Sequence, residues 1–416
     1  MSTTAVEPPA ASFDAGIYRS LTPGVASVLH LNAASAALPS RGVVAVVKAQ
    51  LDLEAEIGPQ AATARAQDGL VTARRRAATL LDCRPDQIAF GDSSARLWSL
   101  AFHALRLPKR GRILVSRGEW GGNLLAIAAA SRDLGIMVET IPTDDAGTID
   151  LAYLQTRIDD DVRLIAVTAV SSASGICQPV AAIGALARPR GCLYIVDAAQ
   201  AIGRFPFSLD RIGADVVTAP ARKWLRGPRG QALAAFSDAA LSDLAMPPLL
   251  DLAGVVWSEA GSASPRSDAR RFETYEYSMA GRLGFGAALG ELLDAGPAAI
   301  SDAINNGIRS LRTALGGCEG VTVQEPIDTD PAFLTLNCGS LHPPDLARAL
   351  SLEGIAVASV GRAYAPAELD ARHLAAVLRV APHAYGRADE IARFANVLER
   401  VVPILRESRH AAASAA

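Results

Sequence analysis

The sequence has few cysteines, few aromatic residues, almost no net charge and no long apolar run. Its five cysteines are scattered over 416 residues and none stands in a Cys-x-x-Cys pair, which argues against a disulfide framework or a zinc ribbon. The net charge is −3 with both signs interspersed, so the basic excess of nucleic-acid binders is missing. No apolar stretch reaches the roughly 18 residues of a membrane-spanning helix. We therefore expect neither a nucleic-acid nor a membrane partner.

Several targeting and ligand motifs are also missing. The beginning, M-S-T-T-A-V-E-P-P-A-A-S, has no basic segment and no apolar core of a secretory signal, so we expect a cytoplasmic protein. No strand pattern is followed by Gly-x-Gly-x-x-Gly, and no P-loop occurs. The six histidines show no metal-ligand spacing. A nicotinamide dehydrogenase and a metal-dependent enzyme are therefore both disfavoured.

Half of the residues are hydrophobic and 20% are charged, which predicts an ordered chain with a large core. The middle of the chain alternates between short apolar runs and helical stretches or loops. The runs read as strands at residues 112–116, 163–170, 192–198, 214–219 and 231–236. This alternation predicts a mostly parallel sheet that is covered on both faces.

The pattern also divides the chain into parts. We expect an irregular N-terminal arm over residues 1–27 that packs with the small domain, followed by a large domain over residues 28–285. A helical pattern covers residues 41–81. A smaller C-terminal domain is expected over residues 286–410, with strands at 333–338, 355–360 and 375–381, and a tail over residues 411–416.

Two charged residues follow apolar runs in the middle of the chain. Asp197 ends one run, and Lys223 follows the next in a loop that contains glycine and proline. Taken alone, such an aspartate most often caps a helix, and such a lysine is a solvated charge. Together, at the carboxyl ends of strands, they have the layout of a pyridoxal 5′-phosphate (PLP) site. There the lysine forms a Schiff base, and the carboxylate keeps the pyridine nitrogen protonated.

Two motifs carry a family resemblance: D-A-A-Q at residues 197–200 and R-K-W-L-R-G-P-R-G at residues 222–230. They resemble the class V aminotransferases of PLP-dependent fold type I, a family with cysteine desulfurases, selenocysteine lyases, isopenicillin N epimerase-like proteins and ergothioneine-pathway C–S lyases. The second motif looks closest to the lyase and epimerase-like branch. The resemblance covers nearly the whole chain. It implies an α/β fold in which a mostly parallel seven-stranded-type sheet between helices forms the large domain, beside a smaller α+β C-terminal domain. It also implies a homodimer with shared active sites.

The resemblance implies a role for several side chains around the cofactor. Trp120 would stack on the pyridine ring, Gln200 would bond the phenolate oxygen, and Asn123 would orient a cofactor oxygen. The phosphate would lie on a helix N-terminus, and hydroxyl or guanidinium groups would come from Ser93, Ser94, Ser172 and Arg222. Read without the resemblance, the same residues could be an ordinary capped helix, a core tryptophan and a surface amide.

The C-terminal part of the region that resembles the family implies which residues bind the substrate. Arg379, at the end of an apolar run, would bind the carboxylate of an amino-acid substrate, and its alternative is a salt bridge between domains. His383 and Asn32 would line the pocket. The segment 271–278 matches one that crosses a dimer interface, but Glu276 stands where desulfurases place a phosphate-binding threonine.

One difference from the pattern of the desulfurases bears on the type of reaction. Persulfide-forming desulfurases carry a cysteine on a loop before the carboxylate-binding arginine, whereas residues 357–370 here contain none. Cys338 lies within an apparent strand and reads as a buried residue. We therefore expect a C–S lyase that acts on a cysteine-derived substrate by β-elimination. The alternatives are an aminotransferase, an epimerase or racemase, and a non-catalytic PLP-fold binding protein.

Overall fold

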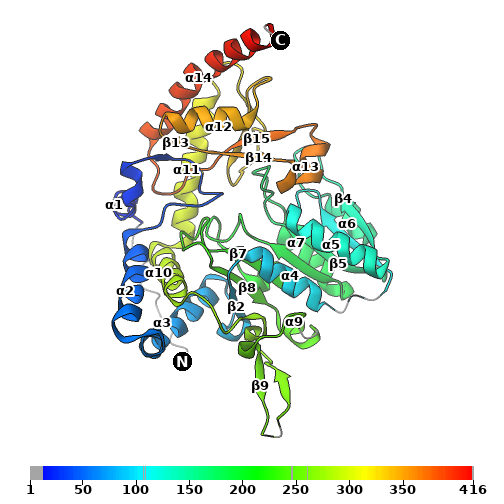
Figure 1. Cartoon of the computed structure of the whole chain (residues 1–416). Helices are drawn as coiled ribbons and strands as arrows, with labels where there is room; N and C mark the ends of the chain where they lie inside the picture. Colours follow the sequence, from blue (N-terminus) through cyan, green and yellow to red (C-terminus); the bar gives the residue numbers. More distant parts are fainter. Residues whose placement is uncertain (1–12, 106, 108, 245–246, 260, 415–416) are drawn as a thin grey trace, which may run out of the picture.

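Figure 1 shows the computed structural model of the chain, in which a large and a small domain lie one above the other. The structure describes residues 13–105, 107, 109–244, 247–259 and 261–414. Residues 1–12 of the expected arm and 415–416 of the expected tail lie outside this range.

A seven-stranded sheet forms the centre of the large domain, in the order β2-β8-β7-β6-β5-β3-β4. Neighbouring strands from β7 to β4 are parallel, and β8 runs antiparallel to both of its neighbours. The predicted α/β fold with a mostly parallel sheet is confirmed. The strands are β2 (Ile88–Gly91), β3 (Arg112–Ser116), β4 (Met137–Ile141), β5 (Val162–Thr168), β6 (Leu193–Asp197), β7 (Val216–Pro220) and β8 (Ala232–Phe236).

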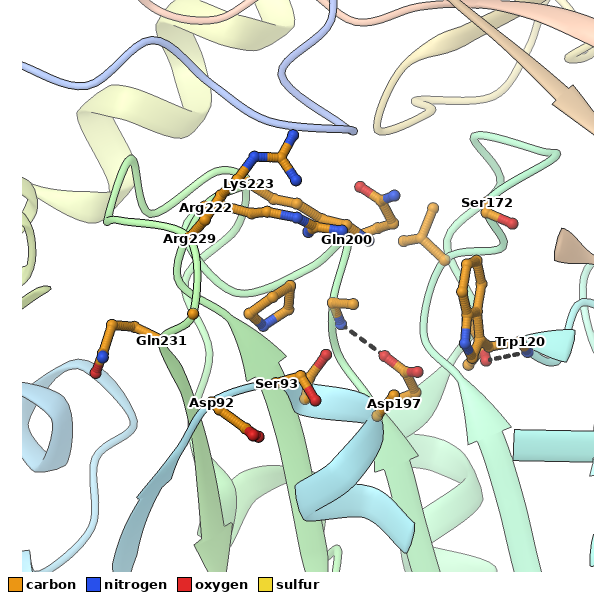
Figure 2. A pocket seen from close by; sticks show the side chains of 17 residues that line it. Asp92, Ser93, Trp120, Ser172, Asp197, Gln200, Arg222, Lys223, Arg229 and Gln231 are labelled. Carbon is orange, nitrogen blue, oxygen red and sulfur yellow. Dashed lines mark hydrogen bonds between the residues drawn. The ribbon is translucent and has the colours of Figure 1, made fainter. Parts of the chain in front are cut away.

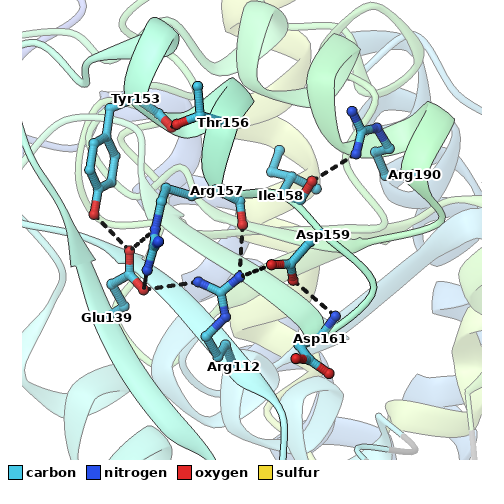
Figure 3. A network of polar contacts seen from close by, with 9 residues as sticks. All are labelled: Arg112, Glu139, Tyr153, Thr156, Arg157, Ile158, Asp159, Asp161 and Arg190. Carbon is cyan, nitrogen blue, oxygen red and sulfur yellow. Dashed lines mark hydrogen bonds and ion pairs between the residues drawn. The ribbon is translucent and has the colours of Figure 1, made fainter.

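The two strands at the ends of this order, β2 and β4, were not predicted from the sequence. Strand β4 has two polar residues, Glu139 and Thr140, at its centre and leaves Met137 62% exposed, so it lacks the continuous apolar run of a central strand. A polar network at its middle, on Glu139, fixes it to the domain (Figure 3). Glu139 accepts hydrogen bonds from Arg157 (2.7 Å), Tyr153 (2.8 Å) and Arg112 (3.0 Å). Mainly through Arg157, these partners lower the pKa of Glu139 to about 2, so the carboxylate stays ionised.

Helices cover both faces of the sheet. The helical pattern over residues 41–81 forms two helices, α2 (Arg41–Ile57) and α3 (Pro59–Leu80), because Gly58 between them has a φ of 84°. Both pack against α10 (Met279–Ala295). The remaining α-helices of the large domain are α4 (Ser94–Ala104), α5 (Gly121–Leu134), α6 (Leu151–Arg157), α7 (Val180–Ala187), α8 (Leu209–Ile212) and α9 (Asp238–Asp243). A hairpin of β9 (Val255–Trp257) and β10 (Ala263–Pro265) extends away from the body (Figure 1).

The small domain has a four-stranded antiparallel sheet in the order β11-β12-β15-β14, with helices beside it. Its strands are β11 (Thr322–Val323), β12 (Leu334–Asn337), β14 (Ala358–Gly361) and β15 (Ala376–Val380). Its helices are α11 (Pro297–Leu315), α12 (Pro343–Leu352), α13 (Pro366–Ala371) and α14 (Ala388–Ser414). Helix α14 includes residues 411–414, so that part of the expected tail is helical instead. No helix in the described part of the chain is both long and apolar enough to cross a membrane.

The N-terminal segment contacts the small domain. Residues expected to be irregular form a short helix, α1 (Ala15–Ser20), which Asp14 caps by accepting from the Gly16 and Ile17 amides. Arg19 at its end makes a two-pronged ion pair with Glu390 (2.8 and 3.0 Å). Strand β1 (Leu29–His30) then pairs in parallel with β13 (Ile355–Ala356). The chain crosses from there to the large domain.

Candidate active site

A cavity of about 260 Å³ opens at the carboxyl ends of β5, β6 and β7, where parallel sheets hold their ligands. The structure brings eight of the predicted site residues together around it (Figure 2). These residues are Ser93, Ser94, Trp120, Ser172, Asp197, Gln200, Arg222 and Lys223. Four other predicted residues, Asn32, Asn123, Arg379 and His383, are not among the residues that line it.

Asp197 and Lys223 influence each other's charge. Asp197 is the last residue of β6, and its oxygens accept from the Ala199 amide (2.9 Å) and Asn123 Nδ2 (3.0 Å). Burial raises the pKa of Asp197, and the charge of Lys223 opposes this shift. Burial lowers the pKa of Lys223 to about 7; Asp197 opposes this, and Arg379 and Arg222 add to it. The Lys223 amine can therefore be neutral near pH 7 and act as a nucleophile or base.

The N-terminus of α4 faces the same cavity. Ser93 caps the helix, because its hydroxyl oxygen accepts from the Arg96 amide at 3.2 Å. Ser94 is the first helical residue and also lines the cavity. The first amides of a helix point outward without partners in the helix, and they favour a bound anion. This end of the cavity is therefore suited to a phosphate group.

Hydrogen bonds fix the walls of the cavity. The Gln200 amide nitrogen donates to the Ala34 carbonyl and its oxygen accepts from Trp224 Nε1, both at 2.9 Å. One N–H of this amide remains for another acceptor. The Trp120 amide donates to Thr168 Oγ1 (3.2 Å). The Trp120 side chain stands upright at one side of the cavity in Figure 2.

Arg379 lies behind the cavity wall. It is almost fully buried, and its terminal nitrogens donate to the Ser172 carbonyl (3.0 Å) and to Ser35 Oγ (2.7 Å). The Arg379 Nε atom, the Arg222 Nη1 atom and the Asn32 side-chain oxygen are buried and have no hydrogen-bond partner in the described part of the chain. Buried polar atoms are rarely left in this state, so these three are suited to a bound ligand.

His383 is in a different environment from the one expected. Its Nδ1 accepts from the Ala384 amide (2.9 Å), and its Nε2 lies 3.2 Å from the Trp224 carbonyl. The imidazole stacks on Tyr385, with ring centroids 4.8 Å apart. Burial shifts the pKa of His383 well below its usual value, so the ring is neutral. The side chain packs between aromatic neighbours and leaves no face toward the cavity.

Sequence reasoning missed several residues of the site. Thr168, Arg229 and Gln231 line the cavity, and Glu119 is buried behind it. Glu119 precedes Trp120 in the motif S-R-G-E-W-G-G-N, so its position beside a predicted cofactor residue was an available signal. A charged residue before an aromatic one normally points to solvent, whereas Glu119 is fully buried.

Comparison with protein-family models gives a match to the class V aminotransferase model over residues 28–394. The chain belongs to the class V aminotransferase family. The predicted family and its cofactor are thereby confirmed, and the chain is a PLP-dependent enzyme.

Individual relatives of this class V enzyme differ in their reactions. It is 32% identical over 410 residues to a probable hercynylcysteine sulfoxide lyase of Mycobacterium tuberculosis, covering 96% of each chain. It is 27% identical to a probable cysteine desulfurase of Methanothermobacter thermautotrophicus, covering 81% of this chain and 84% of the relative. Among solved structures, a cysteine desulfurase from Escherichia coli is similar with a TM-score of 0.86 at 22% identity. That match covers 95% of this chain and all of the other. The structural match supports the fold.

The cavity fits PLP by its own chemistry. Its described residues offer a helix N-terminus for a phosphate, a buried carboxylate for a ring nitrogen and an amine for an aldehyde. Arg222 Nη1 is buried without a hydrogen-bond partner among the described residues, and the Lys223 amine lines the same cavity. A ligand that carries both an anionic and an electrophilic group would satisfy them.

Proposed function

We propose that this PLP-dependent enzyme cleaves the C–S bond of a cysteine-derived amino acid by β-elimination, without forming a persulfide on the protein. The observation that carries the proposal is the lining of the cavity and of its mouth. None of the described residues that line the cavity is a cysteine. The mouth of the cavity includes the 3₁₀ turn after β14, Arg362–Tyr364, which also contains no cysteine. This turn brings the Tyr364 ring to a centroid distance of 5.4 Å from the Trp120 ring.

The thiols elsewhere in the chain are poor candidates for sulfur transfer. Burial raises the pKa of Cys83 and Cys192 to about 12, and the pKa of Cys177 and Cys338 to about 11. Persulfide transfer needs an accessible thiolate, which such pKa values disfavour. The similarity to a probable hercynylcysteine sulfoxide lyase, over nearly the whole length of both chains, supports the lyase reading and suggests a cysteine S-conjugate or its sulfoxide as substrate.

We assign the cofactor contacts as follows. Ser93, Ser94 and Arg222 hold the phosphate, and Asp197 holds the protonated ring nitrogen. Trp120 would cover one ring face, Lys223 would bind the aldehyde carbon, and Gln200 and Ser172 would donate to oxygens of the cofactor. PLP held there would supply an electron sink for the pair that is released when the substrate loses its Cα proton.

The protein's own groups then direct the reaction. Arg379 binds the substrate carboxylate, and Asn32 offers its buried unpartnered oxygen to the substrate amine. Lys223, with a pKa near 7, takes the Cα proton as a neutral amine. The Cβ–S bond breaks with its electron pair leaving on sulfur. Hydrolysis of the remaining three-carbon fragment gives pyruvate and ammonia.

We also propose that the enzyme is a homodimer. Val256 and Trp257 on the β9–β10 hairpin are 53% and 61% exposed, and Tyr275, whose amide donates to Asp251 just before the hairpin, is 67% exposed. A group of large exposed apolar side chains is typical of an interface. Light scattering should give twice the chain mass, and Trp257→Glu should shift the protein toward the monomer. A monomeric wild-type protein would contradict this proposal.

The activity is tested by pyruvate formation. The cofactor-loaded protein is incubated with cysteine, cysteine sulfinate, and thioether and sulfoxide conjugates of cysteine, with Lys223→Ala as the matched control. We expect pyruvate from at least one conjugate and none from the variant. Absence of pyruvate across the panel would refute the lyase. Conversion of the cofactor to its pyridoxamine form would indicate a transaminase, and solvent deuterium at Cα of unconsumed substrate would indicate an epimerase.

A further inference from the structure

A second carboxyl group, that of Glu119, is fully buried directly behind Asp197. It lies in the short turn between β3 and α5. Its Oε1 accepts from Asn123 Nδ2 (2.8 Å) and from Thr168 Oγ1 (2.9 Å), and its Oε2 accepts from Ser116 Oγ (3.1 Å). These three partners are neutral, so no cation compensates a charge on Glu119 directly.

The Asn123 amide joins the two carboxyl groups. Its nitrogen donates both to Glu119 Oε1 and to Asp197 Oδ2, at 2.8 and 3.0 Å. The other Asp197 oxygen accepts from the Ala199 amide, so both oxygens of Asp197 are oriented. One of these two constraints depends on Asn123, whose own position is fixed by Glu119. The Asn123 amide therefore links the Glu119 side chain to the Asp197 side chain.

Glu119 also reaches the other side of the cavity. The Thr168 hydroxyl that donates to Glu119 accepts a hydrogen bond from the Trp120 backbone amide at 3.2 Å. Thus one buried side chain is connected, through a single residue each time, to Asp197 and to Trp120. These are the residues assigned to the nitrogen and to the face of the cofactor ring.

The charge state of Glu119 follows from its surroundings. Burial, and next the charge of Asp197, raise the pKa of Glu119 to about 7, although its three hydrogen bonds oppose the shift. Lys223, the cation that faces this pair, acts on Asp197. With the proton on Oε2, the bond to the Ser116 hydroxyl reverses its direction and the other two remain. The hydrogen-bond pattern therefore accommodates a neutral acid.

We propose that Glu119 is a positioning residue that acts as a neutral acid through Asn123, and that it holds Asp197 in the orientation in which it binds the cofactor. The inference rests on cofactor binding alone and not on the elimination reaction. The two proposals can therefore fail separately.

The test separates hydrogen bonding from charge. Glu119→Gln keeps an acceptor for Asn123 and Thr168 and places a donor toward Ser116, whereas Glu119→Ala removes all three bonds. The dissociation constant of PLP is measured by titrating the cofactor-free proteins. We expect Glu119→Gln to stay within about threefold of the wild type and Glu119→Ala to bind about 10- to 100-fold more weakly, the effect of an unpaired buried polar group.

Two further variants test the link and the specificity. Asn123→Ala should also weaken binding, and the double variant should lose less than the product of the two single losses, because both variants break the same link to Asp197. Glu325→Gln is the matched control, since Glu325 is also buried and its hydrogen bonds to described residues come from Gly175 and Thr335, neither of which lines the cavity. It should lower the unfolding temperature without changing PLP affinity.

Three results would overturn the proposal. The first is a Glu119→Gln variant as weak as Glu119→Ala, because an anion would then be required. The second is wild-type affinity in Glu119→Ala, or in Asn123→Ala should Glu119→Ala fail to fold. The third is a double variant whose loss equals the product of the single losses.

Discussion

The two ends of the central sheet carry cavities of opposite character. The cavity at the amino ends of β6 and β7 is the larger, at about 440 Å³, and it is lined by Cys83, Cys192 and Asp215 among others. Two of its carboxylates are well paired: Asp215 accepts from the Tyr194 amide (2.8 Å) and from Ser237 Oγ (3.0 Å), and Asp238 pairs with Arg84 (2.6 Å).

The cavity at the carboxyl ends of the strands is smaller, but polar groups at it lack hydrogen-bond partners in the part of the chain that the structure describes. Among the described residues, Arg222 Nη1 at this cavity and Arg379 Nε behind its wall are buried without a hydrogen-bond partner. Leaving such groups unpaired destabilises the fold, and this is expected only where a ligand later pairs with them. Unpaired buried polar groups, and not cavity size, therefore identify the functional end of this sheet.

The largest effect on activity is expected from a substitution in the cavity at the carboxyl ends, with a control substitution in the cavity at the amino ends. Lys223→Ala should reduce pyruvate formation by at least about 10³-fold, since the nucleophile and base is lost. Cys192→Ser, on the opposite cavity, should retain activity within about twofold. The measurement is kcat with saturating cofactor for both variants. Equal losses in the two variants would mean that the opposite cavity also serves the reaction.

A second substitution tests the assigned carboxylate site. Arg379→Lys cannot donate to both Ser172 and Ser35 as the guanidinium does. We expect KM to rise about 30-fold, equivalent to about 2 kcal/mol, with kcat within about threefold. Arg204→Lys is the control, because Arg204 is equally buried but donates to Ala332 and Asn305. It should lower the unfolding temperature and leave KM unchanged, and the opposite pattern would contradict the assignment.

The sequence predicted the central part of this architecture well and its margins poorly. Central strands such as β6 are buried on both faces and read as apolar runs, whereas the edge strand β4 depends on Glu139 and its arginine partners. Such partners come from distant positions, and their pairing is not visible in a linear pattern. The break at Gly58 was missed because a glycine inside a helical pattern is also compatible with a continuous helix.

The residues of the candidate site also fall into two groups, those that the sequence predicted correctly and those that it did not. Lys223 and Asp197 follow strands, so their motif and the sheet edge together predicted that they would meet. His383 follows β15 as well, but Tyr18 and Trp224 from two other segments, together with Tyr385 two residues further on, enclose it. The sequence did not predict Glu119 as a site residue, because its hydrogen-bond partners come from β3, β5 and α5. Contacts between elements decide these cases, and spacing along the chain does not encode them.

A pH profile sharpens the contrast, because it reports the unusual pKa of a group at the functional end. Lys223 takes a proton only as a neutral amine, and its pKa is lowered to about 7. Activity should therefore be constant above pH 7 and fall about tenfold per pH unit below it. Arg222→Gln, with saturating cofactor, removes a cation that contributes to the lowered pKa, so the inflection should move upward. An inflection that moves downward would contradict this electrostatic account.

The smallest expected effect concerns the mouth of the functional cavity. Tyr364 is 48% exposed and lies against Trp120, while the Ser172 hydroxyl donates to its carbonyl at 3.4 Å. A side chain on Gly121 would collide with the neighbouring Ala363 carbonyl, so this turn is packed directly on the start of α5. We expect Tyr364→Ala to raise KM about fivefold for sulfoxides with a bulky sulfur substituent, the effect of one lost aromatic contact of about 1 kcal/mol. Substrates with a methyl substituent should change less than twofold, and Tyr364→Phe should behave as the wild type. Equal losses for both substrate sizes would mean that Tyr364 supports the fold of the turn and does not contact the substrate.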